Sequence, residues 1–139
     1  MKYGLIIIIA ILYARNSFAQ RTTFKGDTQT EMNIDAIKSY EKRNKKMMSL
    51  YRKILEMYKN DTLMIRNLKK SQRIWAKWID AEIESYYPNY PNRGEVYGTM
   101  QPLCYYSKLM DWTDERIRHF QLYLKPFDSN VLCAPAAGL

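Results

Sequence analysis

The fold is decided by residues 22–87, which read TTFKGDTQTEMNIDAIKSYEKRNKKMMSLYRKILEMYKNDTLMIRNLKKSQRIWAKWIDAEIESYY. This stretch contains no Pro and a single Gly, Gly26, so it holds few residues that favour a turn. Long helices are therefore expected here. Thr28-Gln29-Thr30-Glu31 matches a capping box, in which a Thr hydroxyl and a Glu carboxylate each bind an unpaired amide of the first turn. We expect the first helix to begin at this box.

Apolar residues then recur at intervals of three and four, the spacing of one helical face. In the first helix they are Ile37, Tyr40, Met47, Met48, Tyr51, Ile54, Leu55 and Tyr58. The pattern loses phase at Asn60-Asp61-Thr62, where the chain makes either a turn or a kink and where Asp61 or Thr62 caps a second helix. The second apolar face consists of Leu68, Ile74, Trp75, Trp78, Ile79 and Ala81.

Residues 87–94 read YPNYPNRG, and their Pro and Gly content predicts a loop that ends the second helix at about Tyr86. A third helical face follows, with Leu103, Tyr106, Leu109, Met110, Thr113, Ile117, Phe120 and Tyr123. Pro102 is expected in the first turn of this helix or at a kink. No strand-like alternation and no repeat accompanies these patterns. The sequence therefore predicts an all-α fold, a small antiparallel bundle of three or four helices.

The first 19 residues have the three regions of a secretory signal peptide: a cation at Lys2, the apolar run Gly4–Tyr13, and the small-residue site Ser17-Phe18-Ala19. The apolar run is shorter than the roughly 20 residues that a membrane-spanning helix needs. We expect cleavage after Ala19 and a periplasmic or secreted protein. Residues 20–139 would then form one helical domain, with an irregular tail over Pro126–Leu139.

Cys104 and Cys133 are the only cysteines in the chain. An oxidising compartment allows them to form a disulfide that tethers the C-terminal tail to the third helix, and two free thiols are the alternative. Two cysteines and the single histidine, His119, do not supply the four ligands of a structural zinc site.

The net charge of +8 is unevenly distributed along the chain. Lys38–Lys59 holds eight basic and two acidic residues, and Asn60–Ile79 holds five basic and one acidic, whereas eight acidic and five basic residues follow from Asp80 onward. Two interpretations are open for a basic run such as Lys42-Arg43-Asn44-Lys45-Lys46. It is either a surface that binds an anionic lipid or an acidic protein, or a solvated helix face. Export and the absence of a nucleic-acid motif argue against nucleic acid as a partner.

The chain carries no recognisable catalytic set. His119 has no Ser or Cys with a matching signature, and no Gly-rich loop is present to hold a phosphate. Asp80 and Glu82 point away from each other on a helix, and the spacing of Asp80 and Glu84 is common on any exposed helix. We therefore expect a protein that is not an enzyme, with no catalytic residue, no bound metal and no cofactor.

Three motifs together resemble the LprI-like family of lysozyme inhibitors, which are exported helical proteins of bacteria. They are Thr28-Gln29-Thr30-Glu31-Met32-Asn33 at the first helix, Gln72-Arg73-Ile74-Trp75 followed by Asp80-Ala81-Glu82 in the second, and Thr113-Asp114-Glu115-Arg116 in the third. The resemblance covers roughly Thr28 to Phe120. It implies a helical domain outside the cytoplasm that inhibits lysozyme.

The chain departs from the family pattern at several positions. Family members usually carry cysteines where this chain has Asp35, Ile83 and Lys108, and an Arg where it has Ile79. Cys104 and Cys133 lie outside the family pattern, so the disulfides of the family do not transfer. The resemblance therefore implies a divergent member.

Two roles are open for the motif residues. Trp75 and Trp78 lie three apart, so at least one is expected to anchor the core, with stacking on a ligand as the alternative. Asp80, Glu82 and Arg116 are expected to form a charge pair between the second and third helices. The simplest role for such a signature is architectural.

Two sets of residues are candidates for contact with a partner. Tyr and Arg are enriched at binding hot spots, which favours the loop residues, although packing on the bundle end is an equal alternative for the tyrosines. An inhibitor of a basic lysozyme must also present an acidic side, near Asp80–Glu84 or Asp111–Glu115, whereas an acidic target would use Lys38–Lys59. The second hypothesis is an envelope-associated module that uses its basic helical face. The contact candidates are Tyr86, Tyr87, Tyr90 and Arg93 in the loop, and Asp111, Asp114 and Glu115 in the third helix.

Overall fold

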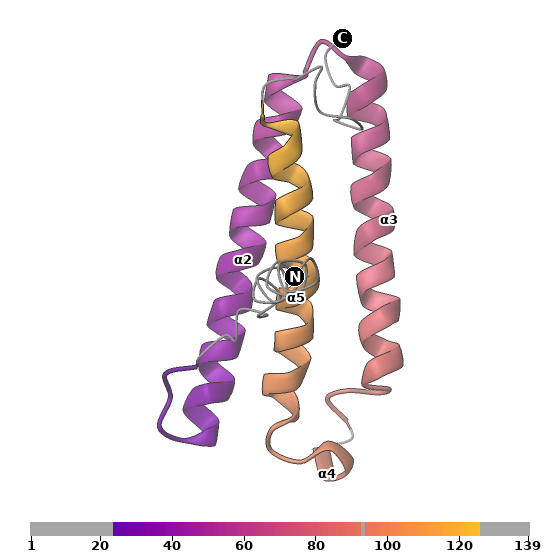
Figure 1. The fold of residues 1–139 in the computed structure, drawn as a ribbon. Helices are drawn as coiled ribbons and strands as arrows, with labels where there is room; N and C mark the ends of the chain where they lie inside the picture. Colours follow the sequence, from indigo (N-terminus) through magenta and orange to yellow (C-terminus); the bar gives the residue numbers. More distant parts are fainter. Residues whose placement is uncertain (1–23, 93, 126–139) are drawn as a thin grey trace, which may run out of the picture.

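The computed structural model describes residues 24–92 and 94–125, with the side chains of Gly94 and Glu95 excepted. Its long helices are α2 (Gln29–Met57), α3 (Thr62–Tyr86) and α5 (Gln101–Tyr123), and a short helix α4 (Gly94–Tyr97) precedes α5. Consecutive long helices run in opposite directions, so α2 and α5 are parallel and α3 is antiparallel to both (Figure 1). The predicted all-α bundle is confirmed for this part of the chain, and no strand occurs in it.

α2 begins where the capping box was expected. The amide of Glu31 donates to the Thr28 hydroxyl at 3.2 Å, and the amides of Asp27 and Thr28 each donate to the Glu31 carboxylate at 3.0 Å. The hydrogen bond from the backbone of Thr28 holds the pKa of Glu31 below its usual value. These bonds satisfy amides that the first helical turn leaves unpaired.

The chain makes a turn between α2 and α3, so the two are separate helices and not one kinked helix. Asp61 is the N-cap of α3, and its carboxylate accepts a hydrogen bond from the Met64 amide at 2.9 Å. The second break ends α3 at Tyr86, as expected, and includes the unpredicted helix α4. Pro102 lies in the first turn of α5, where its missing amide hydrogen breaks no helical bond.

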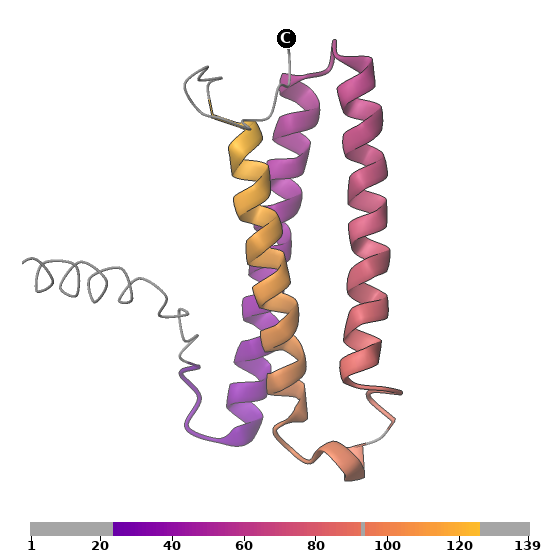
Figure 2. The same cartoon turned by 45° about the vertical axis from the view of Figure 1, so that its right-hand side comes forward.

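Two buried clusters hold the helices together. α2 and α5 approach each other most closely, and Figure 2 shows α3 standing beside this pair. Trp75 packs against both clusters and is therefore the core anchor that was expected in α3. One cluster consists of Met47, Ile54, Leu68, Ile117 and Phe120, and the other of Ile79, Ile83 and Leu109.

The predicted apolar face of α3 is wrong at three positions. Ile74 is 56% exposed and Trp78 is 43% exposed, and Ala81 is exposed as well. Successive residues are turned by about 100° around a helix, so these positions lie to the side of the stripe formed by Leu68 and Ile79. Large apolar side chains therefore occupy the flank of α3 as well as its buried face.

Several expectations fall on residues outside the described ranges. The signal peptide and its cleavage after Ala19 lie there, as do the tail from Pro126 and Cys133. Cys104 is exposed on α5, and the predicted disulfide stays a prediction. None of the helices in residues 24–92 and 94–125 is long and apolar enough to cross a membrane.

Candidate interaction surfaces

A group of apolar side chains lies along α3 and α5, and we call it the aromatic surface: the exposed Ile74, Trp78 and Tyr86 from α3, and the half-buried Trp112 from α5, which also packs against the second core cluster. The Trp78 and Trp112 rings meet edge to face with centroids 5.3 Å apart, and the Tyr86 ring meets Trp112 at 5.9 Å. The Lys108 ammonium lies 5.1 Å from the centre of the Tyr86 ring. These contacts hold the rings in place while the Trp78 and Tyr86 side chains stay exposed.

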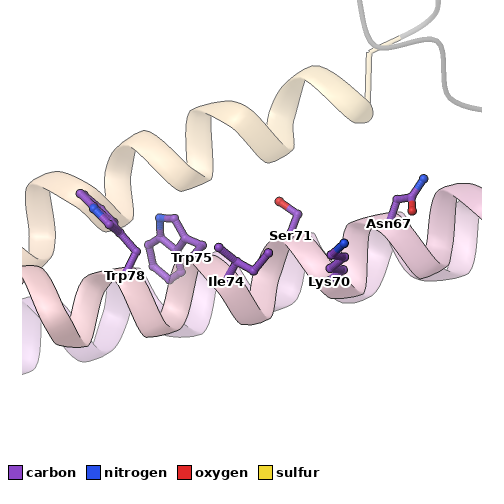
Figure 3. A pocket seen from close by; sticks show the side chains of 6 residues that line it. All are labelled: Asn67, Lys70, Ser71, Ile74, Trp75 and Trp78. Atoms are coloured by element: carbon purple, nitrogen blue, oxygen red, sulfur yellow. The ribbon is translucent and has the colours of Figure 1, made fainter.

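An open hollow of about 510 Å³ continues the aromatic surface along α3. Figure 3 shows that its lining side chains all come from α3, with Trp75 and Trp78 reaching toward the neighbouring helix. Because Ile74 and Trp78 lie four residues apart, they form one apolar strip along the hollow. The lining residues are Asn67, Lys70, Ser71, Ile74, Trp75 and Trp78.

Arg116 joins α5 to α3 beneath this hollow. Its side chain is buried, with the residue 7% exposed, and it donates from Nε to the Gln72 amide oxygen and from Nη2 to the Ser71 hydroxyl, each at 3.0 Å. The guanidinium also lies over the rings of Phe120 and Trp75, at 4.6 and 5.8 Å from their centroids. Removal from solvent lowers the pKa of Arg116.

The predicted charge pair of Arg116 with Asp80 and Glu82 is wrong. The ion pairs within the described residues do not include Arg116, and its partners are neutral. The antiparallel register of α3 and α5 brings Arg116 level with Ser71 and Gln72. Asp80 and Glu82 lie about two and about three turns further along α3, at roughly 5.4 Å per turn, which takes them out of reach.

The remaining motif residues make contacts that hold the fold. The Gln29 amide donates to the Asn33 side-chain oxygen, and the Asn33 amide donates to the Thr99 carbonyl, both at 3.0 Å. The buried Thr113 hydroxyl donates to the Leu109 carbonyl at 2.6 Å. Together with the capping box and Arg116, these bonds give the motifs an architectural role. Met32 is half-buried at the start of α2.

The three acidic candidates on α5 differ in their surroundings. Asp114 accepts a hydrogen bond from Arg43 of α2 at 2.9 Å, so it ties two helices together. Glu115 lies 3.9 Å from Arg118 in an exposed pair, and Asp111 is exposed. Asp111 and Glu115 are therefore more available to a partner than Asp114, and they lie near Trp112 on the helix.

The tyrosines of the loop separate in the same way. Tyr86 belongs to the aromatic surface, whereas Tyr87 and Tyr90 pack against Tyr105 of α5, at centroid distances of 5.8 and 4.5 Å. Tyr87 also meets Tyr97 edge to face at 5.9 Å. Burial raises the pKa of both Tyr87 and Tyr90. The structure thus favours packing on the bundle end for these two residues, and Arg93 lies outside the described residues.

A second hollow, which we call the basic groove, has a volume of about 520 Å³ and lies on the other side of α3, next to α2. Four of its lining side chains are cationic, and none of the lining side chains that the structure describes is a carboxylate. The lining residues are Tyr51, Lys59, Thr62, Ile65, Arg66, Lys69 and Arg73.

From the aromatic surface, sequence patterns predicted only Tyr86 as a contact residue, with ligand stacking as the alternative for Trp78, and they did not predict the basic groove. Trp112 was assigned no role, and Ile74 and Trp78 were placed in the core. A signal was present, because Ile74 and Trp78 are spaced by four residues but are out of line with Leu68 and Ile79. Two apolar strips on one helix indicate that one of them lies outside the core.

Among residues 24–92 and 94–125, no group of three His, Cys, Asp or Glu side chains could hold a metal ion. No curated protein and no solved structure matches the chain. The family model of the lysozyme inhibitor LprI matches residues 19–120, which covers most of the chain and all three motifs. The protein therefore belongs to the lysozyme inhibitor LprI family.

Proposed function

We propose that the protein is exported and inhibits lysozyme, or another peptidoglycan-cleaving hydrolase, by binding it stoichiometrically. Membership of the lysozyme inhibitor family supports this role, and the N-terminal signal pattern supports export. The observation that carries the proposal is the aromatic surface beside the exposed acids of α5. In this proposal the inhibitor acts by occupying its target, as membership of an inhibitor family suggests.

The aromatic surface has the composition of a binding hot spot. Trp and Tyr are enriched at such sites, and exposed apolar side chains gathered in one place mark interaction surfaces. Trp78 and Tyr86 each already contact Trp112, so these rings lose little freedom on binding. This preorganisation favours tight association with a target of complementary shape.

Asp111 and Glu115 supply the charge that a basic lysozyme requires. Both are exposed on α5, and they flank Trp112 in the sequence at spacings that place them on adjoining parts of the helix. Exposed charges at the edge of an interface act mainly on the association rate. The protein therefore meets a basic target with this face, although its own net charge is positive.

The test is muramidase activity measured with the purified protein in molar excess over lysozymes of several classes. Trp78→Ala and Trp112→Ala are expected to weaken inhibition by at least about thirtyfold, the effect of losing a hot-spot side chain. Leu122→Ala is the matched control for Trp78→Ala, because Leu122 is 47% exposed, close to the 43% of Trp78, but lies outside the aromatic surface. Inhibition that responds equally to the control contradicts the assignment of the surface.

The charged arm of the test joins Asp111→Lys with Glu115→Lys. Association is expected to slow more than dissociation quickens, and inhibition by the native protein should weaken as salt rises. Asp27→Lys joined with Glu84→Lys changes the net charge equally at exposed positions elsewhere. Muramidase activity that stays unaffected by the native protein in every lysozyme class would remove the proposed function altogether.

A further inference from the structure

The basic groove presents a row of cations without carboxylate partners. Arg66, Lys69 and Arg73 follow one another at intervals of three and four residues, so they lie on successive turns of α3 over roughly 10 Å. None of the three forms an ion pair with a described residue, whereas Lys59 binds Glu56 at 2.8 Å. Like charges so close together repel, and a bound anion relieves that repulsion.

The groove is also more than a set of surface lysines. Tyr51 and Ile65 line it together with the cations and give it an apolar floor, and Thr62 adds a hydroxyl to the lining. Burial raises the pKa of Tyr51, which keeps its hydroxyl a hydrogen-bond donor. A hollow with cations, hydrogen-bond donors and an apolar floor fits a phosphate group that carries an apolar attachment.

Exposed apolar side chains lie at the same end of the bundle. Met57 ends α2 and is 58% exposed, and Leu63 lies in the first turn of α3 and is 56% exposed. Figure 1 shows the turn between these helices at one tip of the bundle, opposite the end that carries α4. Lys59 lies in this turn, and Arg66 lies within one helical turn after Leu63. The tip therefore combines apolar and cationic side chains.

We propose that this tip docks onto an anionic lipid bilayer, with the basic groove taking up a lipid phosphate and with Met57 and Leu63 entering the interface. Basic residues near a bilayer are attracted by its negative surface potential, and apolar side chains at the interface add to the binding. A soluble phosphate uses the cations alone and leaves Met57 and Leu63 in water. The exposed apolar pair therefore favours a lipid over a soluble anion.

The first experiment measures co-sedimentation of the full protein with vesicles of phosphatidylcholine and phosphatidylglycerol, and with vesicles of phosphatidylcholine alone. Binding is expected only to the anionic vesicles. Joining Arg66→Gln, Lys69→Gln and Arg73→Gln should weaken it by about fivefold for each cation removed. Joining Lys42→Gln, Lys45→Gln and Lys46→Gln lowers the charge equally on α2 away from the groove, and this control should bind more tightly than the groove variant. Equal binding of the two variants overturns the groove as the site.

The second experiment separates a lipid from a soluble phosphate. Joining Met57→Ser with Leu63→Ser keeps every cation and should reduce vesicle binding severalfold. Inorganic phosphate at an equal concentration of phosphate groups should displace little of the native protein from the vesicles. Full vesicle binding by the serine variant, or full displacement by inorganic phosphate, contradicts docking on a bilayer.

This inference does not rest on lysozyme inhibition. The groove variant leaves the aromatic surface intact, and the two surfaces lie on different sides of α3. Far-UV circular dichroism and chemical denaturation of each variant show whether the bundle has folded. Muramidase assays and vesicle binding then report on the two surfaces separately, so the failure of one proposal is distinguishable from the failure of the other.

Discussion

The two sides of α3 differ in chemistry although neighbouring residues build them. Toward α5, the helix presents the apolar strip of Ile74 and Trp78, and toward α2 it presents the cations Arg66 and Arg73. Arg73 and Ile74 are adjacent in sequence, but a turn of about 100° sends them to opposite sides. A helix that docks through a narrow buried stripe thus keeps two flanks of different chemistry facing solvent. That stripe consists of Leu68, Ile79 and Ile83.

The largest expected effect concerns the packing of α3 against the core, on which the positions of the aromatic surface and the basic groove both depend. Trp75→Ala should lower the free energy of unfolding by about 3 kcal/mol, because Trp75 packs against both buried clusters. Trp78→Ala should lower it by about 1 kcal/mol, the worth of an aromatic pair at an exposed site. Chemical denaturation of both variants measures the difference.

One result of this experiment would contradict the assigned buried face of α3. A loss of stability that is larger for Trp78→Ala than for Trp75→Ala means that the buried face of α3 has been assigned to the wrong residues. Tyr90→Ala serves as a second reference, because Tyr90 stacks on one ring of α5 and is expected to lose less stability than Trp75→Ala.

An intermediate effect is expected at Arg116. Arg116→Ala removes both donors to α3 and leaves the Gln72 and Ser71 oxygens without them, which should cost about 2 kcal/mol. Arg118→Ala, at an exposed position on the same helix, should change stability by less than about 0.5 kcal/mol. Thermal and chemical unfolding of the pair measures this difference, and similar values for both variants are inconsistent with Arg116 as the link between the helices.

The smallest expected effect distinguishes the acids of α5. Asp114→Asn should cost about 0.5–1 kcal/mol, because it breaks the partly exposed pair with Arg43, whereas Asp111→Asn should leave stability nearly unchanged. The order should reverse for association with a basic lysozyme, which is expected to slow only for Asp111→Asn. Denaturation and stopped-flow binding measure the two orders, and a parallel order in both assays removes the distinction.

The ends of the helices were predictable because local chemistry sets them. The capping box at Thr28 and Glu31, the cap at Asp61 and the early turn position of Pro102 each depend on residues a few positions apart. All of the expected apolar positions of α2 and α5 are also buried or half-buried, because one dominant periodicity runs through each helix.

The candidate surfaces were less predictable because they depend on which flank of each helix stays uncovered. Periodicity alone assigned Ile74 and Trp78 to the core, since both fit an apolar arc that is wider than the buried stripe. The partners of Arg116 depend on the register between α3 and α5, and sequence spacing does not specify a register between separate helices. Asp80 has the charge that a partner of Arg116 needs, but the register of the two helices places it out of reach.

The parallel arrangement of α2 and α5 has a consequence for how the chain assembles. The helices that approach most closely are the most distant in sequence, since the Arg43–Asp114 pair spans 71 residues. A chain that must close so long a loop before its best packing forms folds more slowly than a bundle of local hairpins. α3 lies inside that loop and packs less closely on α5 than α2 does. Local opening of the native protein should therefore begin with α3, the helix that bears both surfaces.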